Sequence, residues 1–328
     1  VINDIDTARL MRDKIMNIAV MSGSTMDTQK VISMVLKDPP NESFRNVALW
    51  LLAGGENVYL QDSDILAMKT KDIISVLTHL KFTFPSIKSI TAPARSQSAV
   101  KRKASDFISL QQAGLTDIEI RMDSGYDPVL EFMQKGETSS QQIQAGLKIK
   151  DAGIALTEYV MLGLGGKNDL SNHAIGTATT LNEINPDTIK LRTLAINNTF
   201  PLQADIINGD FFRATDEEMI QEEKQLIENL NVYSYFQSNH VSNLLPEIEG
   251  KLPHDKNRLL LIIDTFLSMP LKYRINFMVG RRVGLYKNLT DMEDRQRFDL
   301  VEQIKNKLNQ GARAFDQSLI FMLMEDFV

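Results

Sequence analysis

Residues 114–138 read GLTDIEIRMDSGYDPVLEFMQKGET, and this stretch decides the class of fold. Within it, residues 117–122 alternate between apolar and polar side chains, as a β-strand does. Asp123 and Ser124 follow directly, and residues 126–136 have the character of a helix closed by Lys-Gly. In parallel α/β folds the carboxyl ends of the strands open onto a crevice that binds ligands. The carboxylate and the hydroxyl therefore stand where such a fold would place a ligand site.

Strand-like stretches of this kind recur along the chain. They begin about 30 to 37 residues apart, a spacing that suits strand–helix units with right-handed crossovers. Between them, residues 71–81 carry apolar side chains at helical spacing, and residues 105–113 and 139–152 each end at a glycine. This repetition predicts an α/β fold with a parallel sheet or a partial barrel. The predicted strands cover residues 57–61, 87–92, 117–122, 154–164 and 188–196, and VYSYF (232–236) is the candidate for a sixth.

The segments before and after these strands are predicted to be mostly helical. Thr215 and Glu218 match a capping box, which starts a helix after a loop over residues 197–214. From Asp255 onward about three helices are expected. The helices expected before the first strand cover residues 1–14, 24–37 and 43–53.

The bulk composition bounds the class of protein. With 328 residues, 43% of them hydrophobic, the chain can form one large core, or a core domain plus a smaller one. We place their boundary near residues 240–250, with a barrel-like domain over 1–240 and a mostly helical region over 241–328. The net charge of −6 argues against nonspecific nucleic-acid binding. No run approaches the roughly 20 apolar residues of a membrane span, so a cytoplasmic protein without a membrane partner is expected.

The sequence contains no cysteine. Structural disulfides are therefore excluded, as is a metal held by thiolates of this chain alone. The four histidines show no spacing typical of metal ligands, such as HxxxH. We therefore assign no metal-ligating residue, and the sequence points to no catalytic residue either.

Polar clusters follow the first two predicted strands. Asp62, Ser63 and Asp64 come directly after the first strand, where two carboxylates and a hydroxyl could bind an ammonium group or a ribose. Asp and Ser are also common helix caps and turn formers, so a purely structural role stays open. Arg95 follows the second strand and could either clamp a ligand carboxylate or lie as a solvated surface charge.

The opening stretch holds a third cluster. Because side chains alternate between the two faces of a strand, Arg121 and Asp123 are expected to point to the same side. Burying both would be costly unless they pair or meet a ligand, which makes them and Ser124 a candidate site. The alternative is an Arg–Asp ion pair that only orders the loop.

The fourth strand runs into several glycines, in the sequence VMLGLGG (160–166). Around Gly163, Leu164 and Gly165 the missing side chains would let the backbone approach a flat ligand closely. No GxGxxG motif opens a helix here, so we discount a Rossmann site.

Two cations lie within the fifth predicted strand. Lys190 and Arg192 are on one face by alternation, and charge inside a strand that otherwise looks buried is unusual. They are expected to reach the same mouth of the sheet as Arg121. An ordinary TIM-barrel lyase or aldolase would use such a strand lysine, but Lys190 lacks a convincing set of partners in the sequence.

Taken in order, these segments resemble the radical S-adenosylmethionine (radical SAM) proteins. The opening stretch resembles the family's GLxxxxxGLESGSDxVLxxxxKGxT-like pattern, and VYLQDSDIL resembles the strand that carries its amino-group-binding motif. AGIALTEYVMLGLGG and IKLRTLAI look like the two strands that come next. SNHVSNLLPEIEGKLPHDKNRLLLIID is similar to the C-terminal part of uncharacterised bacterial and archaeal members. The resemblance covers roughly residues 1 to 285, and its specificity comes from the order of the motifs.

The resemblance implies a partial (β/α)6, TIM-like barrel with a mainly helical C-terminal extension. In this family, S-adenosylmethionine lies across the carboxyl ends of the strands and one iron of a [4Fe–4S] cluster binds its methionyl part. Reductive cleavage then yields a 5′-deoxyadenosyl radical, which abstracts hydrogen from a substrate. The resemblance therefore implies an electron donor such as ferredoxin or flavodoxin, and a substrate that the sequence does not identify.

The resemblance also implies roles for the strand-end residues. Asp62, Ser63 and Asp64 would lie near the methionyl amino group. Asp123 and Ser124 would lie near the ribose, Gly163 to Gly165 would pass the adenine, and Arg192 could meet the carboxylate. Arg95 and Arg121 complete the set of residues expected to bind the cofactor.

Two departures from the family pattern matter. Asp123 stands where the family usually has Glu, so its reach is one methylene shorter. The CxxxCxxC loop that holds the cluster is absent, although three thiolates are needed to bind three of its irons. Because VINDIDTARLMRDK looks like the helix that follows this loop and the first strand, we expect a preceding cluster segment in the intact enzyme. The alternative is a cysteine-free barrel that acts as a binding or scaffold protein without radical chemistry.

Overall fold

The computed structural model describes residues 1–21, 28–61, 63–197, 199–309 and 318–324. Within them, strands and helices alternate along most of the chain, as the repeated sequence pattern predicts. All six predicted strands are present, and the short β7, which the sequence analysis missed, is added to them. The strands are β1 (Asn57–Tyr59), β2 (Ser89–Ala94), β3 (Asp117–Asp123), β4 (Ala155–Leu162), β5 (Thr188–Thr193), β6 (Tyr235–Gln237) and β7 (Glu249–Lys251).

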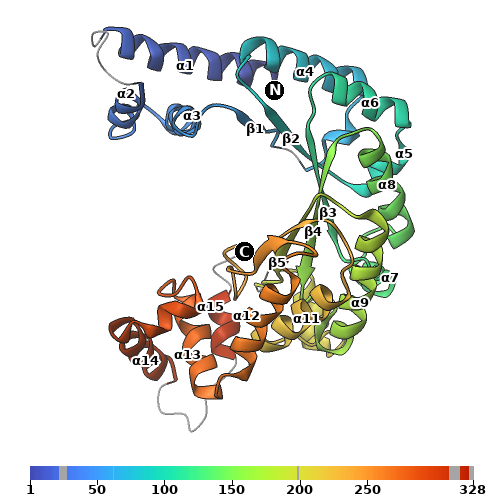
Figure 1. The fold of residues 1–328 in the computed structure, drawn as a ribbon, viewed down its shortest axis with the longest axis vertical. Helices are drawn as coiled ribbons and strands as arrows, with labels where there is room; N and C mark the ends of the chain where they lie inside the picture. The colour runs from blue at the N-terminus through green and yellow to red at the C-terminus, as the bar shows by residue number, and fades with distance from the viewer. Residues whose placement is uncertain (22–27, 62, 198, 310–317, 325–328) are drawn as a thin grey trace. The chain divides into compact units, whose positions relative to one another are not determined.

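The seven strands follow one another in the sheet in the order of the sequence, from β1 to β7. β1 pairs with β2, β4 with β5, and β5 with β6 in parallel, whereas β6 and β7 are antiparallel. Parallel neighbours need a crossover connection, and the helices between the strands supply it (Figure 1). The expected α/β class, with the strand order of a partial barrel and a helical C-terminal part, is confirmed.

The chain divides into two compact units. Unit 1 comprises Val1–Glu119 and Lys148–Ala155, and unit 2 comprises Ile120–Leu147 and Leu156–Val328. The sequence-based boundary near residues 240–250 stays a prediction. Unit 1 contains the helices α1 (Ile2–Met21), α2 (Thr28–Val35), α3 (Glu42–Leu52), η1 (Ile65–Ala67), α4 (Thr70–Thr83), α5 (Ser96–Lys101) and α6 (Ala104–Gln112).

Unit 2 contains most of the remaining helices, and α8 contributes residues to both units. The helices are α7 (Asp127–Phe132), α8 (Ser139–Asp151), α9 (Gly166–Ile184), α10 (Leu202–Asn208), α11 (Asp216–Asn229), α12 (Lys256–Ser268), α13 (Leu271–Arg282), η2 (Leu289–Glu293), α14 (Arg295–Asn309) and α15 (Ser318–Met324).

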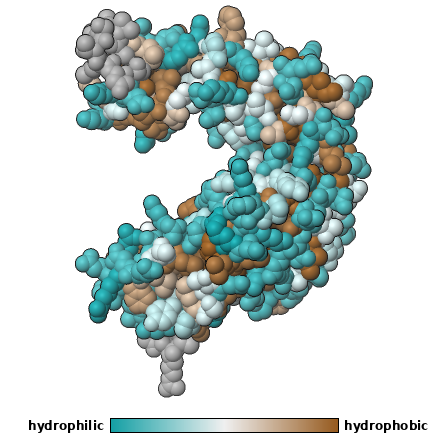
Figure 2. Space-filling model, viewed as in Figure 1, coloured by the Kyte–Doolittle hydropathy of each residue, from teal (hydrophilic) through white to brown (hydrophobic). Residues whose placement is uncertain are grey.

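Burial follows the alternation that the sequence shows. Along β4, Leu156, Glu158, Val160 and Leu162 are buried and the side chains that alternate with them are only half-buried. The buried face contributes to a large apolar core of unit 2, which also takes residues from β5, α9 and α11 to α15. A separate small core in unit 1 joins Ile15 of α1, Ile32 of α2 and Phe44 of α3. In Figure 2, hydrophobic residues (brown) are visible over α2 and α3.

Local signals fix several helix starts. Asn41 Oδ1 accepts a hydrogen bond from the Phe44 N–H at 2.9 Å and caps α3. The predicted capping box is confirmed: Thr215 Oγ1 accepts from the Glu218 N–H at 3.2 Å, and Glu218 Oε2 accepts from the Thr215 N–H at 2.9 Å. Both bonds satisfy backbone donors that the first turn of a helix leaves without partners.

Three sequence-based expectations are corrected. The segment expected to be a loop over residues 197–214 contains α10, which ends at Gly209 with a φ of 81°. α5 directly follows Arg95, where only a strand end was expected. After Asp255 there are four α-helices within the described residues instead of about three. α5, α10 and α15 are each only six or seven residues long, and helices this short depend on tertiary packing.

Among the residues with described positions, no helix has both the length and the apolar character needed to cross a membrane.

Candidate functional site

After β1, the side chain of Asp64 forms hydrogen bonds within unit 1. Asp64 Oδ2 accepts a hydrogen bond from the Ser98 hydroxyl at 2.5 Å, and Oδ1 accepts from the Arg95 N–H at 3.3 Å. Arg95 precedes the first residue of α5, so the Asp64 carboxylate sits at the amino end of that helix, where the helix dipole favours an anion. The side chains of Ser63 and Arg95 are exposed, and Asp62 lies outside the described residues. Asp64 and Arg95, which follow different strands, are thus brought together.

At the end of β3, the side chains of Asp123 and Ser124 contact other residues of unit 2. The Asp123 carboxylate pairs with the ammonium of Lys135, and its φ of 58° ends the strand geometry. Arg121 is exposed, and no ion pair between it and Asp123 is present in the described part of the chain. Ser124 is buried, and its hydroxyl accepts a hydrogen bond from the Tyr126 N–H at 3.0 Å. Contacts of Asp123 and Ser124 with a ribose stay a prediction.

The glycine-rich turn after β4 packs closely against helices of unit 2. Gly163 has a φ of 81° and its N–H donates to Glu222 Oε2 at 2.7 Å. A Cβ on Gly163 would lie 2.7 Å from the sulfur of Met219, so a side chain does not fit here. Glu222 Oε1 contacts Nδ1 of His173, and both side chains are 1% exposed. The turn is therefore held in place by α11 and α9.

A pocket of about 200 Å³ opens beside this turn. Leu164 and Gly165 form one side of it, and Phe132 of α7 and Phe211 form another. The two phenyl rings are stacked, with centroids 6.0 Å apart and an interplanar angle of 17°. Polar side chains, among them Lys167, Asp169 and Asp210, line the pocket as well. A slot of this kind suits a flat ring system that also carries polar groups.

The cations of β5 gather around one aromatic ring. Lys190 Nζ lies 5.3 Å and Arg192 Cζ 5.1 Å from the centroid of Tyr159 on β4, which is within cation–π range. The strand register pairs Tyr159 with Lys190 and Met161 with Arg192, so all four side chains lie on the less buried face of unit 2's strands. Arg192 is exposed, and its guanidinium can receive a carboxylate.

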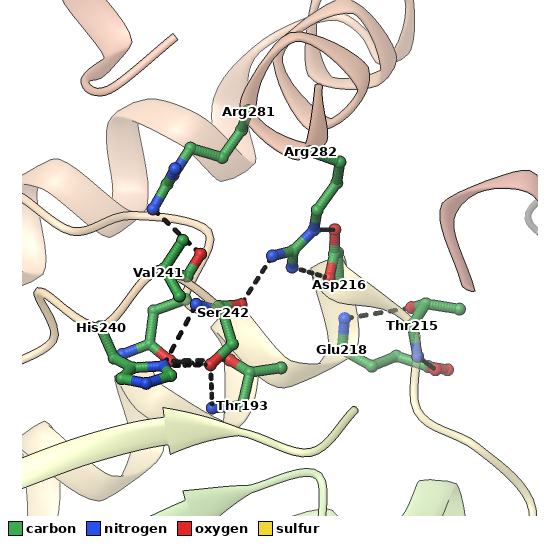
Figure 3. A network of polar contacts seen from close by, with 10 residues as sticks. Thr193, Thr215, Asp216, Glu218, His240, Val241, Ser242, Arg281 and Arg282 are labelled. Atoms are coloured by element: carbon green, nitrogen blue, oxygen red, sulfur yellow. Dashed lines mark hydrogen bonds and ion pairs between the residues drawn. The ribbon is translucent and has the colours of Figure 1, made fainter. Parts of the chain in front are cut away.

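A buried polar network holds the end of β5 (Figure 3). The Thr193 N–H donates to Ser242 Oγ at 3.2 Å, and Arg282 Nη1 of α13 donates to the Ser242 carbonyl at 2.6 Å. Arg282 also pairs with Asp216 in the first turn of α11. The strand end that carries Arg192 is therefore fixed by side chains that follow it by many residues.

His240 adds a titratable group beside Arg192. Partial burial, and then the positive charge of Arg192, lower the pKa of His240 below its usual value, which favours the neutral ring. Its Nδ1 lies 2.7 Å from Ser242 Oγ in the network of Figure 3. Sequence analysis found no metal-ligand spacing among the histidines and gave this one no role, because Arg192 and Thr193, which lie near it, come from β5.

The helix-facing side of β4 buries a carboxyl group. Glu158 is fully buried, and neither carboxylate oxygen has a hydrogen-bond partner among the described residues. Burial, and then the negative charges of Glu137 and Asp123, raise the pKa of Glu158 well above its usual value. Burial at this position therefore favours the neutral, protonated form of Glu158.

The side chains of this chain can be compared with the ligands that two kinds of metal site require. A [4Fe–4S] cluster of the radical SAM type needs three thiolates, and the sequence supplies none. In the parts of the chain that the structure describes, no group of three or more His, Asp or Glu side chains could hold a metal ion. The side chains of this chain therefore do not fit the cluster.

No family model matches this sequence, and no curated protein matches it either. Solved structures do match part of the fold. The archaeal Methanocaldococcus infernus Elp3 with an N-terminal deletion has a TM-score of 0.49 at 14% identity, over 63% of this chain and 55% of that one.

Two further solved proteins are similar in part. Coproporphyrinogen III oxidase (HemN) from Escherichia coli, described as a radical SAM enzyme, has a TM-score of 0.43 at 11% identity, over 53% of this chain and 38% of that one. The radical S-adenosylmethionine methyltransferase TsrM from Kitasatospora setae has a TM-score of 0.40 at 10% identity, over 80% of this chain and 55% of that one. The matches thus span about half, or less, of these proteins' lengths. At such identities and TM-scores their activities do not transfer to this chain.

The structure identifies site residues that sequence reasoning missed. Phe132, Phe211 and Tyr159 form the aromatic surfaces, and Glu222 positions the glycine turn. A signal existed for Tyr159, which alternates with the buried residues of its strand. No sequence signal pairs Phe132 with Phe211, because they lie in segments separated by two strands and several helices.

Proposed function

We propose that this chain binds S-adenosylmethionine and forms the nucleoside-binding part of a radical SAM enzyme. The observation that carries the proposal is the pocket of about 200 Å³ beside the glycine turn, lined by the stacked rings of Phe132 and Phe211. An adenine ring suits this slot in shape and polarity. Arg192, exposed beside Tyr159, would receive the methionyl carboxylate.

In this proposal the chain supplies the nucleoside site and not the cluster. Without cysteine, this sequence cannot hold the [4Fe–4S] cluster, so the thiolates for radical chemistry have to come from outside these 328 residues. The proposed division of labour is that this chain binds and orients S-adenosylmethionine. Hydrogen abstraction from a substrate, and the electron donor that it needs, belong to the cluster-bearing enzyme.

Calorimetric titration tests the proposal with two ligands that share the adenosine part. S-adenosylmethionine carries the amino-acid carboxylate, and 5′-methylthioadenosine lacks it. Phe132→Ala should weaken both ligands about 5- to 100-fold, the range of base–aromatic stacking. Arg192→Gln should weaken S-adenosylmethionine and leave 5′-methylthioadenosine unchanged, because only the former has a carboxylate.

Phe82→Ala is the matched control, because Phe82 is 83% exposed and does not line the pocket. It should bind both ligands like the unchanged protein. Failure of the unchanged protein to bind either ligand, or equal affinities in Phe132→Ala and Phe82→Ala, would refute the proposal.

A second candidate function is nucleoside binding without radical chemistry. It is favoured by the absence of cysteine from the sequence. Thiol titration and mass measurement of the protein isolated from its source cells separate the two. Cysteines in the isolated protein support the enzyme, and a cysteine-free protein of the mass of this chain supports the binding protein.

A further inference from the structure

Unit 1 contains a larger cavity, and its lining includes none of the residues assigned above to S-adenosylmethionine, although Gln61 and Ile65 flank Asp62 to Asp64 in the sequence. Its volume is about 550 Å³, within the range typical of small-molecule sites. It is enclosed by side chains of α1, α3, α4 and β1, which Figure 1 shows at the amino-terminal end of the chain. All of its lining residues belong to unit 1, so the cavity does not depend on unit 2.

One wall of the cavity is aromatic and held in position. The Trp50 indole Nε1 donates a hydrogen bond to the Asn57 carbonyl at 2.8 Å, which fixes the ring against β1. Trp50 also meets Phe84 edge to face, with centroids 5.2 Å apart and an interplanar angle of 81°. The guanidinium of Arg12 of α1 lies 4.9 Å from the centroid of the Phe84 ring. Such a wall loses little freedom when a ligand packs against it.

The remaining walls are mainly apolar and almost without charge. Ile5, Val58 and Leu80 are among the aliphatic residues that line the cavity. Besides the Trp50 indole, the polar side chains are amides, such as that of Asn46, the phenol of Tyr59 and the carboxylate of Asp4. Among the described lining residues there is no Lys, Arg or His. The one cation at the described lining is the amino group of Val1, which pairs with the Asp4 carboxylate at 3.3 Å. An anionic ligand would therefore meet no unpaired cation among these residues, whereas a neutral ligand could place an amide or hydroxyl group against the Asn side chains.

From volume, aromatic wall and charge together, we infer that this cavity binds a neutral, mainly apolar organic molecule with a ring system. The ring packs on Trp50, and a polar group of the ligand meets the amides at the rim. The site is separate from the one proposed for S-adenosylmethionine, and each can exist without the other.

Trp50 is the only tryptophan of the chain, so its emission reports on the cavity directly. The probes are a matched pair with one ring system: neutral N-phenyl-1-naphthylamine and anionic 8-anilino-1-naphthalenesulfonate. The neutral probe should bind with sensitised emission from Trp50 and at least about tenfold more tightly than the sulfonate, because no described lining side chain is cationic and the amino group of Val1 is already paired with Asp4. Equal affinity, or tighter binding of the sulfonate, would overturn the inference.

A pair of alanine replacements locates the probe. Ala8 lines the cavity on α1, and Ala8→Phe should fill part of it and weaken binding of the neutral probe about tenfold or more. Ala113→Phe is the control, because Ala113 is also half-buried in unit 1 but lies outside the cavity. If both variants bind like the unchanged protein, the probe does not occupy the cavity and the inference is refuted.

Two further measurements distinguish a filled cavity from a misfolded variant and from association of two copies. Circular dichroism shows whether Ala8→Phe folds, and if it does not, Asn46→Asp replaces it: the added negative charge should weaken the neutral probe less than the sulfonate. Sedimentation shows whether two copies associate. A dimer with Trp50 already shielded from quenchers would assign the cavity to a second copy and overturn the small-molecule inference. Unchanged probe binding at saturating S-adenosylmethionine confirms that the two sites are independent.

Discussion

Arg282 and Asp216 form a bidentate ion pair inside unit 2, with Nε–Oδ2 at 3.1 Å and Nη2–Oδ1 at 2.6 Å. Their side chains are 0% and 1% exposed, so neither charge is solvated by bulk water. The pair joins the last turn of α13 to the first turn of α11, and Arg282 also donates to the carbonyl of Ser242 (Figure 3). The C-terminal helices are thereby tied to the loop that fixes the end of β5.

We expect Arg282→Met to lower the free energy of unfolding by about 3–5 kcal/mol, because it leaves the Asp216 carboxylate buried without a countercharge. Urea unfolding followed by circular dichroism measures the change. Arg297→Met is the matched control, since Arg297 is 48% exposed and pairs with Asp291 at the surface. It should change stability by at most about 1 kcal/mol. Similar small losses in both variants would show that the buried pair is not formed.

Glu223 should make stability depend on pH. Burial, opposed by a hydrogen bond from Ser238 and reinforced by the charges of Glu222 and Glu247, raises the pKa of Glu223 from 4.5 to about 8. The folded state therefore keeps its proton between these values while the unfolded state releases it. The stabilising contribution is complete below pH 4.5 and is lost as the pH rises to about 8.

Urea unfolding at several pH values between about 5 and 8, the interval between the pKa values of the unfolded and folded states, measures this fall in stability. Glu223→Gln should flatten it, because the amide does not titrate. The pKa of Glu247 is also raised by burial, so part of the slope should remain in that variant. Identical slopes with Glu or Gln at this position would contradict a protonated Glu223.

Gly163→Ala should destabilise the protein through two effects that a control can separate. Its φ of 81° strains any other residue, and the new Cβ would also lie 2.7 Å from the sulfur of Met219. Gly209 has the same φ of 81° and nothing within 4 Å of the equivalent Cβ position. Gly209→Ala should cost about 1 kcal/mol or slightly more, from backbone strain alone. Gly163→Ala should cost about 1–3 kcal/mol beyond that, from overpacking.

The thermal midpoints of the two glycine variants provide the measurement. If they fall equally, the contact between the glycine turn and Met219 is looser than the structure shows. The same turn borders the proposed adenine slot, so Gly163→Ala should also weaken 5′-methylthioadenosine, and Gly209→Ala should not.

Thr215→Ala should lower the free energy of unfolding by about 0.5–2 kcal/mol, because it removes the side-chain acceptor of the capping box. Thr265→Ala provides a control of opposite sign. Thr265 lies exposed within α12, where alanine is the better helix former, so this change should be neutral or slightly stabilising. Urea unfolding of the two variants shows whether Thr215 stabilises the start of α11 as a cap or contributes nothing to stability.

Local pattern was enough to predict most of the elements. The alternation of DIEIRM and of the residues after Gly153 gave β3 and β4, and helical spacing gave α4, α6 and α8 within a few residues of their ends. The capping box at Thr215 and Glu218 was also readable, because both of its hydrogen bonds lie within one helical turn. These features depend on neighbours in the sequence, and side-chain periodicity records which face of an element is buried.

The sequence predicted where the candidate site residues lie better than it predicted which residues they contact. The strand-end residues lie after β1, β3, β4 and β5, as expected. Their contacts came as new findings: Asp64 serves the start of α5, Asp123 meets Lys135, and Gly163 binds Glu222. A strand pattern tells which side a residue faces but carries no information on which helix will cover that side.

The sequence by itself determined the alternation of strands and helices, the lack of thiolates, and the polar residues at the strand ends. Only the tertiary structure decided that Phe132 and Phe211 stack into a slot, that Trp50 lines a cavity, and that Arg282 secures the end of β5. The physical reason is that periodicity is a local property of a few neighbouring residues, whereas pockets and buried ion pairs form between segments that only packing of the whole core brings together.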